Sequence, residues 1–302
     1  MRTILSVCFC FAVISASPAA ESDAFRDEVG KHLDFLQNGK PIVRYMYAFD
    51  DSTDQARHET YKVYHHVFDP AGGAFITKGS GGKYTHHRGI FIGFARLGHG
   101  GKTYDHWHMA NVNIRHKQFI EKEANDKSAA VTSLIHWNAT DGKPVIEEKR
   151  TLRVHFSDKN AHLLTDFVSR LKAVNGEVVL KGDPEHAGMQ YRPANEVAQN
   201  KSAKYTFHAD GINPKKDRDL PWVALTYKLG QQLYTVQHMR HPDDPSDSVY
   251  SAYRDYGRFG NYFVHTIADG DSLMVRYRLR ITLGAAPSRK VLAAEYEKYV
   301  SK

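Results

Sequence analysis

Short extended runs, divided by turn residues, occupy most of the chain after residue 32. In residues 33–45, two such runs flank Asn38-Gly39, a dipeptide typical of two-residue β-hairpin turns. Further β-rich runs follow at residues 89–94, 130–137, 147–156, 162–170, 205–208, 222–227, 233–238, 262–266 and 273–283. Many short strands between Gly, Asp, Asn and Pro turns predict an all-β fold, a large β-sandwich.

One long helix is expected at the end of the chain. Ser288 can cap a helix over residues 289–299, which places Leu292, Tyr296 and Val300 on one stripe. A helix over residues 24–33 is a further option. Because no linker-like stretch divides residues 21–302, the prediction is one β-sandwich domain with a C-terminal helix.

The first 20 residues have the pattern of a cleaved signal peptide. A charged start precedes an apolar run over residues 4–14, and small residues follow up to Ala19 and Ala20. The apolar run is too short to anchor the chain in a bilayer, so we expect no stable membrane insertion once it is removed. The expected location is secreted or periplasmic.

Cysteine usage and charge exclude several classes of function. Cys8 and Cys10 both lie in the expected signal segment, so the mature chain has no disulfide and no thiolate. Lys and Arg number 41 against 34 Asp and Glu, and no basic run with interleaved aromatic residues occurs. A nucleic-acid partner is therefore not expected.

Histidines are concentrated in residues 85–108, THHRGIFIGFARLGHGGKTYDHWH, which contain five of them. If residues 105–108 are extended, His106 and His108 point to the same face and can share one metal ion. One of the two adjacent histidines near the start of the segment can join them. The spacing permits, without demanding, a divalent metal held by His87, His106 and His108.

The same histidines can instead carry protons, because imidazole titrates near neutral pH. Glu185 or His186, in a turn-like GDPEHAG segment, would be the base or acid, and Arg88 would stabilise an oxygen that becomes negative. The candidate catalytic residues are His86, His87, Arg88, Glu185 and His186. In a purely structural alternative, these histidines hydrogen-bond loop backbones.

Polar and aromatic side chains near these segments are candidates for binding a polyhydroxyl substrate. Amide and guanidinium groups can donate hydrogen bonds to hydroxyls, and aromatic rings can stack on a sugar. The candidate substrate-binding residues are His106, Trp107, His108, Gln190, Arg192, Asn195, His238, Arg254 and Tyr256.

Three stretches together resemble the DUF6807 family, whose members are often labelled methane oxygenase PmoA. They are THHRGIFIG at residues 85–93, DHW at residues 105–107 and DPEHAGMQYR at residues 183–192. The resemblance implies a secreted bacterial β-sandwich that accompanies sugar-processing enzymes, with an architecture similar to aldose-epimerase or mutarotase sandwiches. The label names an integral membrane protein, yet this chain has no apolar run long enough to span a bilayer beyond its first 20 residues.

Three hypotheses follow. The leading one is an enzyme of hydrolase, lyase or epimerase type that uses His/Glu acid–base chemistry on a sugar or keto-glycoside and needs no cofactor. The second is a non-catalytic sugar-binding sandwich. The third is a metal-dependent oxygenase or hydrolase. These sequence features do not specify the sugar, its linkage or the oligomeric state.

Overall fold

The computed structural model describes residues 23–301, so the expected signal peptide lies outside the described residues. Two eight-stranded sheets and one four-stranded sheet form most of the structure, and neighbouring strands pair antiparallel. The prediction of an all-β fold with a C-terminal helix is therefore confirmed.

Each sheet combines strands from distant parts of the sequence. In spatial order, the first sheet contains β1 (Phe25–Glu28), β2 (His32–Gln37), β3 (Lys40–Met46), β4 (Tyr64–Val67), β5 (Ile90–Phe94), β13 (Ala187–Tyr191), β18 (Phe259–Tyr262) and β17 (Val249–Tyr250). The second contains β14 (Lys204–Phe207), β15 (Trp222–Leu229), β16 (Gln232–Arg240), β20 (Ser272–Leu283), β11 (Leu163–Ala173), β10 (Pro144–His155), β9 (Ser128–Asn138) and β8 (Asn113–Asn125). The small sheet contains β19 (His265–Ile267), β12 (Val178–Lys181), β6 (Arg96–His99) and β7 (Lys102–Tyr104).

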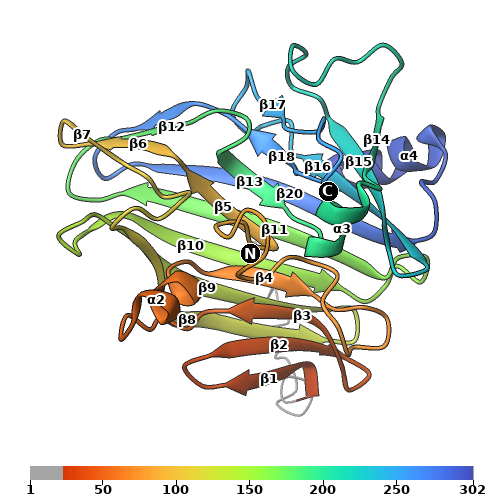
Figure 1. The fold of residues 1–302 in the computed structure, drawn as a ribbon, viewed down its shortest axis with the longest axis horizontal. Coiled ribbons are helices and arrows are strands. Elements are labelled where there is room, and N and C mark those ends of the chain that lie inside the picture. Colours follow the sequence, from red (N-terminus) through yellow and green to blue (C-terminus); the bar gives the residue numbers. More distant parts are fainter. Residues whose placement is uncertain (1–22, 302) are drawn as a thin grey trace, which may run out of the picture.

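The two large sheets lie one over the other (Figure 1), and the main hydrophobic core fills the space between them. Tyr191 of β13 and Tyr227 of β15 meet across this interface, with hydroxyl oxygens 2.6 Å apart. Phe94 of β5 packs near Trp137 of β9, with ring centroids 6.3 Å apart. Buried apolar side chains fill the inner faces of the two sheets, so functional residues are expected at the strand ends and in the loops.

The N-terminal strands test two of the sequence predictions. β2 and β3 pair around Asn38 and Gly39, whose φ angles of 51° and 75° suit a hairpin turn with two left-handed residues. The predicted hairpin is therefore confirmed. The optional helix over residues 24–33 is wrong, because β1 pairs with β2 across this segment and buries Leu33 and Phe35.

Helices are few in the described residues. α2 (Asp54–Thr60) is capped by Thr53, whose Oγ1 accepts a hydrogen bond from the amide of Ala56. α3 (Asn195–Asn200) follows β13 after a short bend, and α4 (Arg289–Val300) ends the chain. α4 packs the predicted stripe of Leu292, Tyr296 and Val300 against the second sheet, with Leu292 fully buried. Tyr299, which lies outside that stripe, is buried there as well. No helix within residues 23–301 is long and apolar enough to cross a membrane.

β8 is the longest strand that the sequence pattern does not predict. It lies at the edge of the second sheet, and most of its residues are exposed or half-buried. A solvated edge strand needs no strict alternation of apolar and polar residues, so its polar sequence lacks the usual strand signal.

Candidate active site

The site is built at the end of β5. The carbonyl of Phe94 accepts a hydrogen bond from the amide of His106 at 2.9 Å, and the amide of Ala95 donates to the carbonyl of His186 at 3.0 Å. Gly93 allows the first of these turns to lie close, because a Cβ there would be 2.4 Å from the carbonyl oxygen of His106. Two adjacent residues at the end of one strand therefore hold two turns from distant parts of the sequence.

The first turn joins a carboxylate to an imidazole within four residues. Asp105 Oδ1 accepts the backbone amides of Trp107 and His108, at 3.0 and 2.8 Å, and its Oδ2 lies 2.8 Å from His108 Nδ1. Burial raises the pKa of Asp105, but the hydrogen bonds from His108 and the amides outweigh it and lower the pKa overall. The carboxylate stays ionised and holds His108 through Nδ1.

The second turn repeats this arrangement. Asp183 Oδ1 accepts the amide of Glu185 at 2.9 Å and lies 2.9 Å from His186 Nδ1. In both turns the aspartate is three residues before the histidine, a D-x-x-H pattern. Each Nδ1–H donates to a carboxylate, so Nε2 of each ring keeps its lone pair and is the atom that can accept a proton.

Three imidazoles from three segments lie together in front of these aspartates. The ring centroids of His108 and His186 are 5.2 Å apart, and that of His86 lies 4.4 Å from the first and 6.5 Å from the second. His108 and His186 are 40% and 35% exposed, so a substrate can reach them. Burial, followed by the charge of Lys62, lowers the pKa of His86 to about 2, so that ring is neutral.

His106 lies apart from this group, which corrects the prediction for residues 105–108. The segment is a turn rather than a strand, so His106 and His108 point in different directions. His106 is buried against Trp137 and its Nε2 lies 3.0 Å from the carbonyl oxygen of Asn138. The metal set of His87, His106 and His108 is not assembled, and residues 23–301 contain no group of three or more His, Cys, Asp or Glu arranged to hold a metal ion.

Arg88 supports the loop that carries His86 and His87. Its guanidinium donates to the carbonyls of Thr85, His87 and His58, at 2.5, 2.8 and 2.6 Å, and the side chain is fully buried. These bonds turn the donors away from any substrate. The expected role of Arg88 in stabilising a negative oxygen is therefore replaced by a role in positioning the loop.

Glu185 is also not in position to act as a base. Its carboxylate accepts hydrogen bonds from Tyr253 at 2.9 Å, from Arg254 at 2.8 Å and from Arg258. Burial raises the pKa of Glu185, but the bonds from Arg258 and Arg254 outweigh it and hold the pKa at about 2. A carboxylate held by two guanidinium groups is a poor proton acceptor, so Glu185 joins the loop of residues 253–258 to the second turn.

Trp107 and Arg192 form the floor of the site. Trp107 is fully buried on Phe91, with its ring centroid 6.2 Å from that of His186 and 5.8 Å from Cζ of Arg192. Arg192 is 1% exposed, and its Nη1 donates to Oε1 of Gln190 at 2.8 Å. Gln190 thus orients the guanidinium of Arg192 rather than facing a substrate. Trp107 packs beside His186 as a buried support for the site.

A small recess of about 10 Å³ lies beside Arg192. Lys78 is buried there and its Nζ donates to Oδ1 of Asn195 at 2.5 Å, while burial lowers the pKa of this lysine to about 8. Tyr84 and Tyr256 form part of the wall, with ring centroids 5.0 Å apart. The lining residues are Lys78, Lys83, Tyr84, His87, Arg192, Pro193, Ala194, Asn195, Ala198 and Tyr256.

A family model described as "Family of unknown function (DUF6807)" matches residues 32–297, nearly the whole described chain. The chain belongs to the DUF6807 family. The resemblance drawn from the three sequence stretches is therefore confirmed, and the match itself brings no activity with it. A comparison of the DUF6807 chain with curated proteins found no match.

Solved structures that match the DUF6807 chain share little sequence with it. A mutant of heparan sulfate lyase HepC from Pedobacter heparinus is 10% identical with a TM-score of 0.43, and the match covers 86% of this chain and 37% of the lyase. A heparinase III is 9% identical with a TM-score of 0.40, and the match covers 87% and 36%. Galactose 1-epimerase from Lactobacillus acidophilus NCFM is 8% identical with a TM-score of 0.38, and the match covers 84% and 99%. The DUF6807 chain thus spans about a third of each of the first two proteins.

His238 lies away from this site in the DUF6807 chain. The ring is fully buried between the sheets, with Nδ1 3.1 Å from the hydroxyl of Tyr250 and Nε2 3.1 Å from Sδ of Met189. Burial lowers its pKa to about 3. The side chain is part of the core, and its expected role in substrate binding has no support in this position.

Residues of the site that were missed from the sequence include Lys62, Lys78, Tyr84, Asp105 and Asp183. Lys62 is buried next to the histidines, where its Nζ donates to the carbonyl of Trp107 at 2.6 Å and lies 4.3 Å from the ring centroid of Phe91. Burial lowers the pKa of Lys62 well below its ordinary value. The repeated D-x-x-H pattern is a sequence signal that could have identified Asp105 and Asp183, whereas a single lysine has no signal of this kind.

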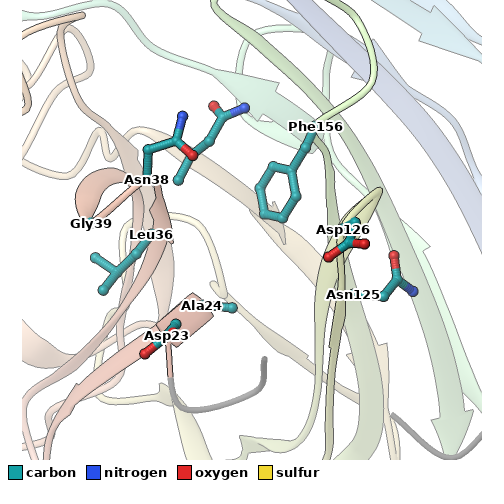
Figure 2. A pocket seen from close by; sticks show the side chains of 9 residues that line it. Asp23, Ala24, Leu36, Asn38, Gly39, Asn125, Asp126 and Phe156 are labelled. Atoms are coloured by element: carbon teal, nitrogen blue, oxygen red, sulfur yellow. The ribbon is translucent and has the colours of Figure 1, made fainter. Parts of the chain in front are cut away.

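A wide hollow of about 940 Å³ lies elsewhere on the DUF6807 chain, at the ends of β2, β8 and β10. Figure 2 shows Asn38 and Leu36 on one side of it and Asp126 and Phe156 on the other. No histidine lines this hollow, so it lacks the paired proton carriers found at β5.

Proposed function

We propose that this DUF6807 protein is an acid–base enzyme that acts on a carbohydrate, with His108 and His186 as its proton carriers. The observation that carries the proposal is the adjacent pair of aspartate-bound imidazoles, with ring centroids 5.2 Å apart. Each aspartate fixes the tautomer of its ring and stabilises the imidazolium that forms when Nε2 takes a proton. The leading hypothesis is kept, with His108 in place of Glu185.

The spacing of the two rings favours one kind of reaction. A sugar between two imidazoles would need centroids roughly 7–8 Å apart, because each face needs about 3.5–4 Å of contact distance. Rings 5.2 Å apart must therefore approach a bound sugar from the same side. One ring removes a proton from carbon, and the other delivers a proton to a neighbouring carbon or to a departing oxygen. Isomerisation or elimination fits this arrangement better than inversion at a single carbon.

The surrounding side chains support a carbohydrate substrate. Lys78, Asn195, Tyr84 and Tyr256 place ammonium, amide and phenol groups near His87, and such donors and acceptors suit a polyhydroxyl molecule. The expected signal peptide supports a secreted or periplasmic location. We propose both features together, as a sugar-processing enzyme that works outside the cytoplasm.

A metal-dependent enzyme is the second candidate, because imidazoles bound to carboxylates through Nδ1 also commonly ligate metals. His108 and His186 would be two of the ligands, in place of the set expected from the sequence. Because residues 23–301 contain no third His, Cys, Asp or Glu arranged with them, water or substrate would complete the coordination. Elemental analysis of untagged protein, alongside His108→Gln, tests this candidate. About one equivalent of metal that is lost in the variant would favour it over acid–base chemistry.

Proton exchange tests the leading proposal even when the product is not known. The protein is incubated in D₂O with neutral sugars, uronic acids and keto-sugars, and carbon-bound protons are followed by NMR. Wild-type protein should exchange or convert one class, and His108→Gln and His186→Gln should not. His99→Gln is the matched control, because this half-exposed ring lies on β6, where its Nδ1 is 3.1 Å from the carbonyl oxygen of Glu177. Binding without exchange or conversion would identify a non-catalytic sugar-binding protein instead.

A further inference from the structure

Three arginine–carboxylate pairs elsewhere in this protein share one geometry. In each, the Nε–Nη2 edge of the guanidinium faces the two carboxylate oxygens. The pairs are Arg44 with Asp34 at 2.6 and 3.0 Å, Arg150 with Glu148 at 2.7 and 2.9 Å, and Arg278 with Asp166 at 2.5 and 2.8 Å. Two parallel hydrogen bonds of this kind give arginine its selectivity for planar oxyanions.

Arg192 presents the same edge without a protein partner. Gln190 holds its Nη1 and so fixes the plane of the guanidinium, whereas Nε and Nη2 bond to no atom of residues 23–301. Both atoms are buried, and burial lowers the pKa of Arg192 to about 9. A buried guanidinium without a counter-charge is energetically unfavourable, so a ligand that brings a negative charge is favoured here.

The rest of the recess adds positive charge and no negative charge. Lys78 and Lys83 line it beside Arg192, and no carboxylate is among its lining residues. Arg258, the next largest influence on the pKa of Arg192 after burial, also has Nε and Nη2 without a partner in the described part of the chain. Glu185, whose charge raises the pKa of Arg192, is already held by Arg258 and Arg254.

We propose that Arg192 binds a carboxylate of the substrate side-on, which makes the substrate a sugar acid. This inference rests on the proposed function and deepens it. If the carboxylate is attached to the carbon that loses its proton, the C–H bond breaks and the proton goes to a histidine Nε2. The electron pair of that bond then passes onto the carboxylate oxygens that face Arg192.

Calorimetric titration of the mature protein tests the inference. D-glucuronate and D-galacturonate are compared with D-glucose and D-galactose, and with inorganic phosphate and sulfate. We expect a uronate to bind at least tenfold more tightly than its neutral counterpart, and Arg192→Gln and Arg192→Lys to lower that affinity at least tenfold. Arg289→Gln, on the exposed surface, should bind like wild type. Equal binding of uronates and neutral sugars, or full affinity in folded Arg192 variants, overturns the inference.

The remaining measurements distinguish a carboxylate ligand from an inorganic anion, and they distinguish failure of this inference from failure of the proposed function. Phosphate or sulfate binding more tightly than any uronate would overturn a carboxylate ligand. If the Arg192 variants do not fold, the comparison of uronate with neutral sugar in wild-type protein still decides. Titration of the His108→Gln/His186→Gln variant isolates binding from turnover. Uronate binding there supports the inference even if no exchange is found, whereas exchange of neutral sugars alone upholds the proposed function and rejects the inference.

Discussion

The ring centroid of His186 lies 5.2 Å from that of His108, and each ring is held through Nδ1 by the aspartate three residues before it. The two turns belong to different parts of the sequence, yet both are fixed to the end of β5. Whether this pair carries protons, what holds it in place and how the fold responds to acid can each be tested.

Replacing either aspartate should impair turnover more than binding. In Asp105→Asn and Asp183→Asn, either the oxygen or the nitrogen of the new amide can face Nδ1 of the histidine. When the nitrogen faces it and donates to Nδ1, the ring hydrogen stays on Nε2, so Nε2 has no lone pair to accept a proton. We expect kcat on the substrate found by proton exchange to fall about 10²- to 10⁴-fold with little change in KM. Asp210→Asn, which changes an exposed partner of Arg289, is the control. Wild-type kcat in both site variants would contradict a role for the pairs.

Glu185→Gln separates a base from a structural carboxylate. Because Glu185 is held by Tyr253, Arg254 and Arg258, its loss should loosen the loop and raise KM, with kcat changed less than about tenfold. A catalytic base would instead show a fall in kcat of at least about 100-fold. Steady-state kinetics distinguish the two, and Arg254→Gln should resemble Glu185→Gln only if the structural role is right.

The fold should lose stability in mild acid. Burial lowers the pKa of His66 and His238 to about 3 and that of His106 to about 4, all below the ordinary value of 6.5. As the pH falls below 6.5, the unfolded chain takes up protons that the folded chain does not. Stability from these rings is therefore present above pH 6.5 and is lost toward pH 4, by about 1.4 kcal/mol per pH unit for each fully neutral histidine.

Denaturant unfolding between pH 7.5 and 4.5 measures this loss. His238→Gln should reduce the slope of unfolding free energy against pH by about one proton, or about 1.4 kcal/mol per pH unit. Identical slopes in wild type and His238→Gln would show that this ring is not neutral in the folded protein.

Gly93→Ala should disturb the site through packing alone. Its Cβ would be 2.4 Å from the carbonyl oxygen of His106, so the turn that carries His108 must move away from β5. We expect a loss of about 1–3 kcal/mol in unfolding free energy and a fall in kcat. Gly98→Ala is the matched control, because its nearest contact, Cβ of Val179, is at an ordinary 3.4 Å. Similar effects in both variants would argue against this account.

Local features of the sequence were predictable because their signals are local. The Asn38-Gly39 turn and the stripe of α4 depend on a few neighbouring residues, and both are present. Extended geometry for residues 105–108, the condition for His106 and His108 to share a metal, is not met, because Asp105 has the side chain that commonly closes a turn on later amides.

Roles that depend on tertiary partners could not be read from the sequence. Nothing near Arg88 in the chain indicates that His58 supplies one of its acceptors, and nothing near Glu185 points to Arg258. Burial also depends on the tertiary fold, because only the folded sandwich distinguishes His238 in the core from the partly exposed His186. The sequence pattern therefore located the histidine-containing segments, whereas the role of each residue in them depends on its tertiary contacts.

β5 has a consequence for motion as well as for position. Its last residue and the one after it hold the two turns, and the carbonyl of Gly89, just before it, accepts the amide of Arg192 at 2.8 Å. A shift of this strand within the sandwich would carry both imidazoles and the backbone of Arg192 along as one rigid frame. Breathing of the two sheets should then leave the spacing between proton carriers unchanged, and any opening or closing around a ligand should fall to the outer loops at residues 78–87 and 253–258.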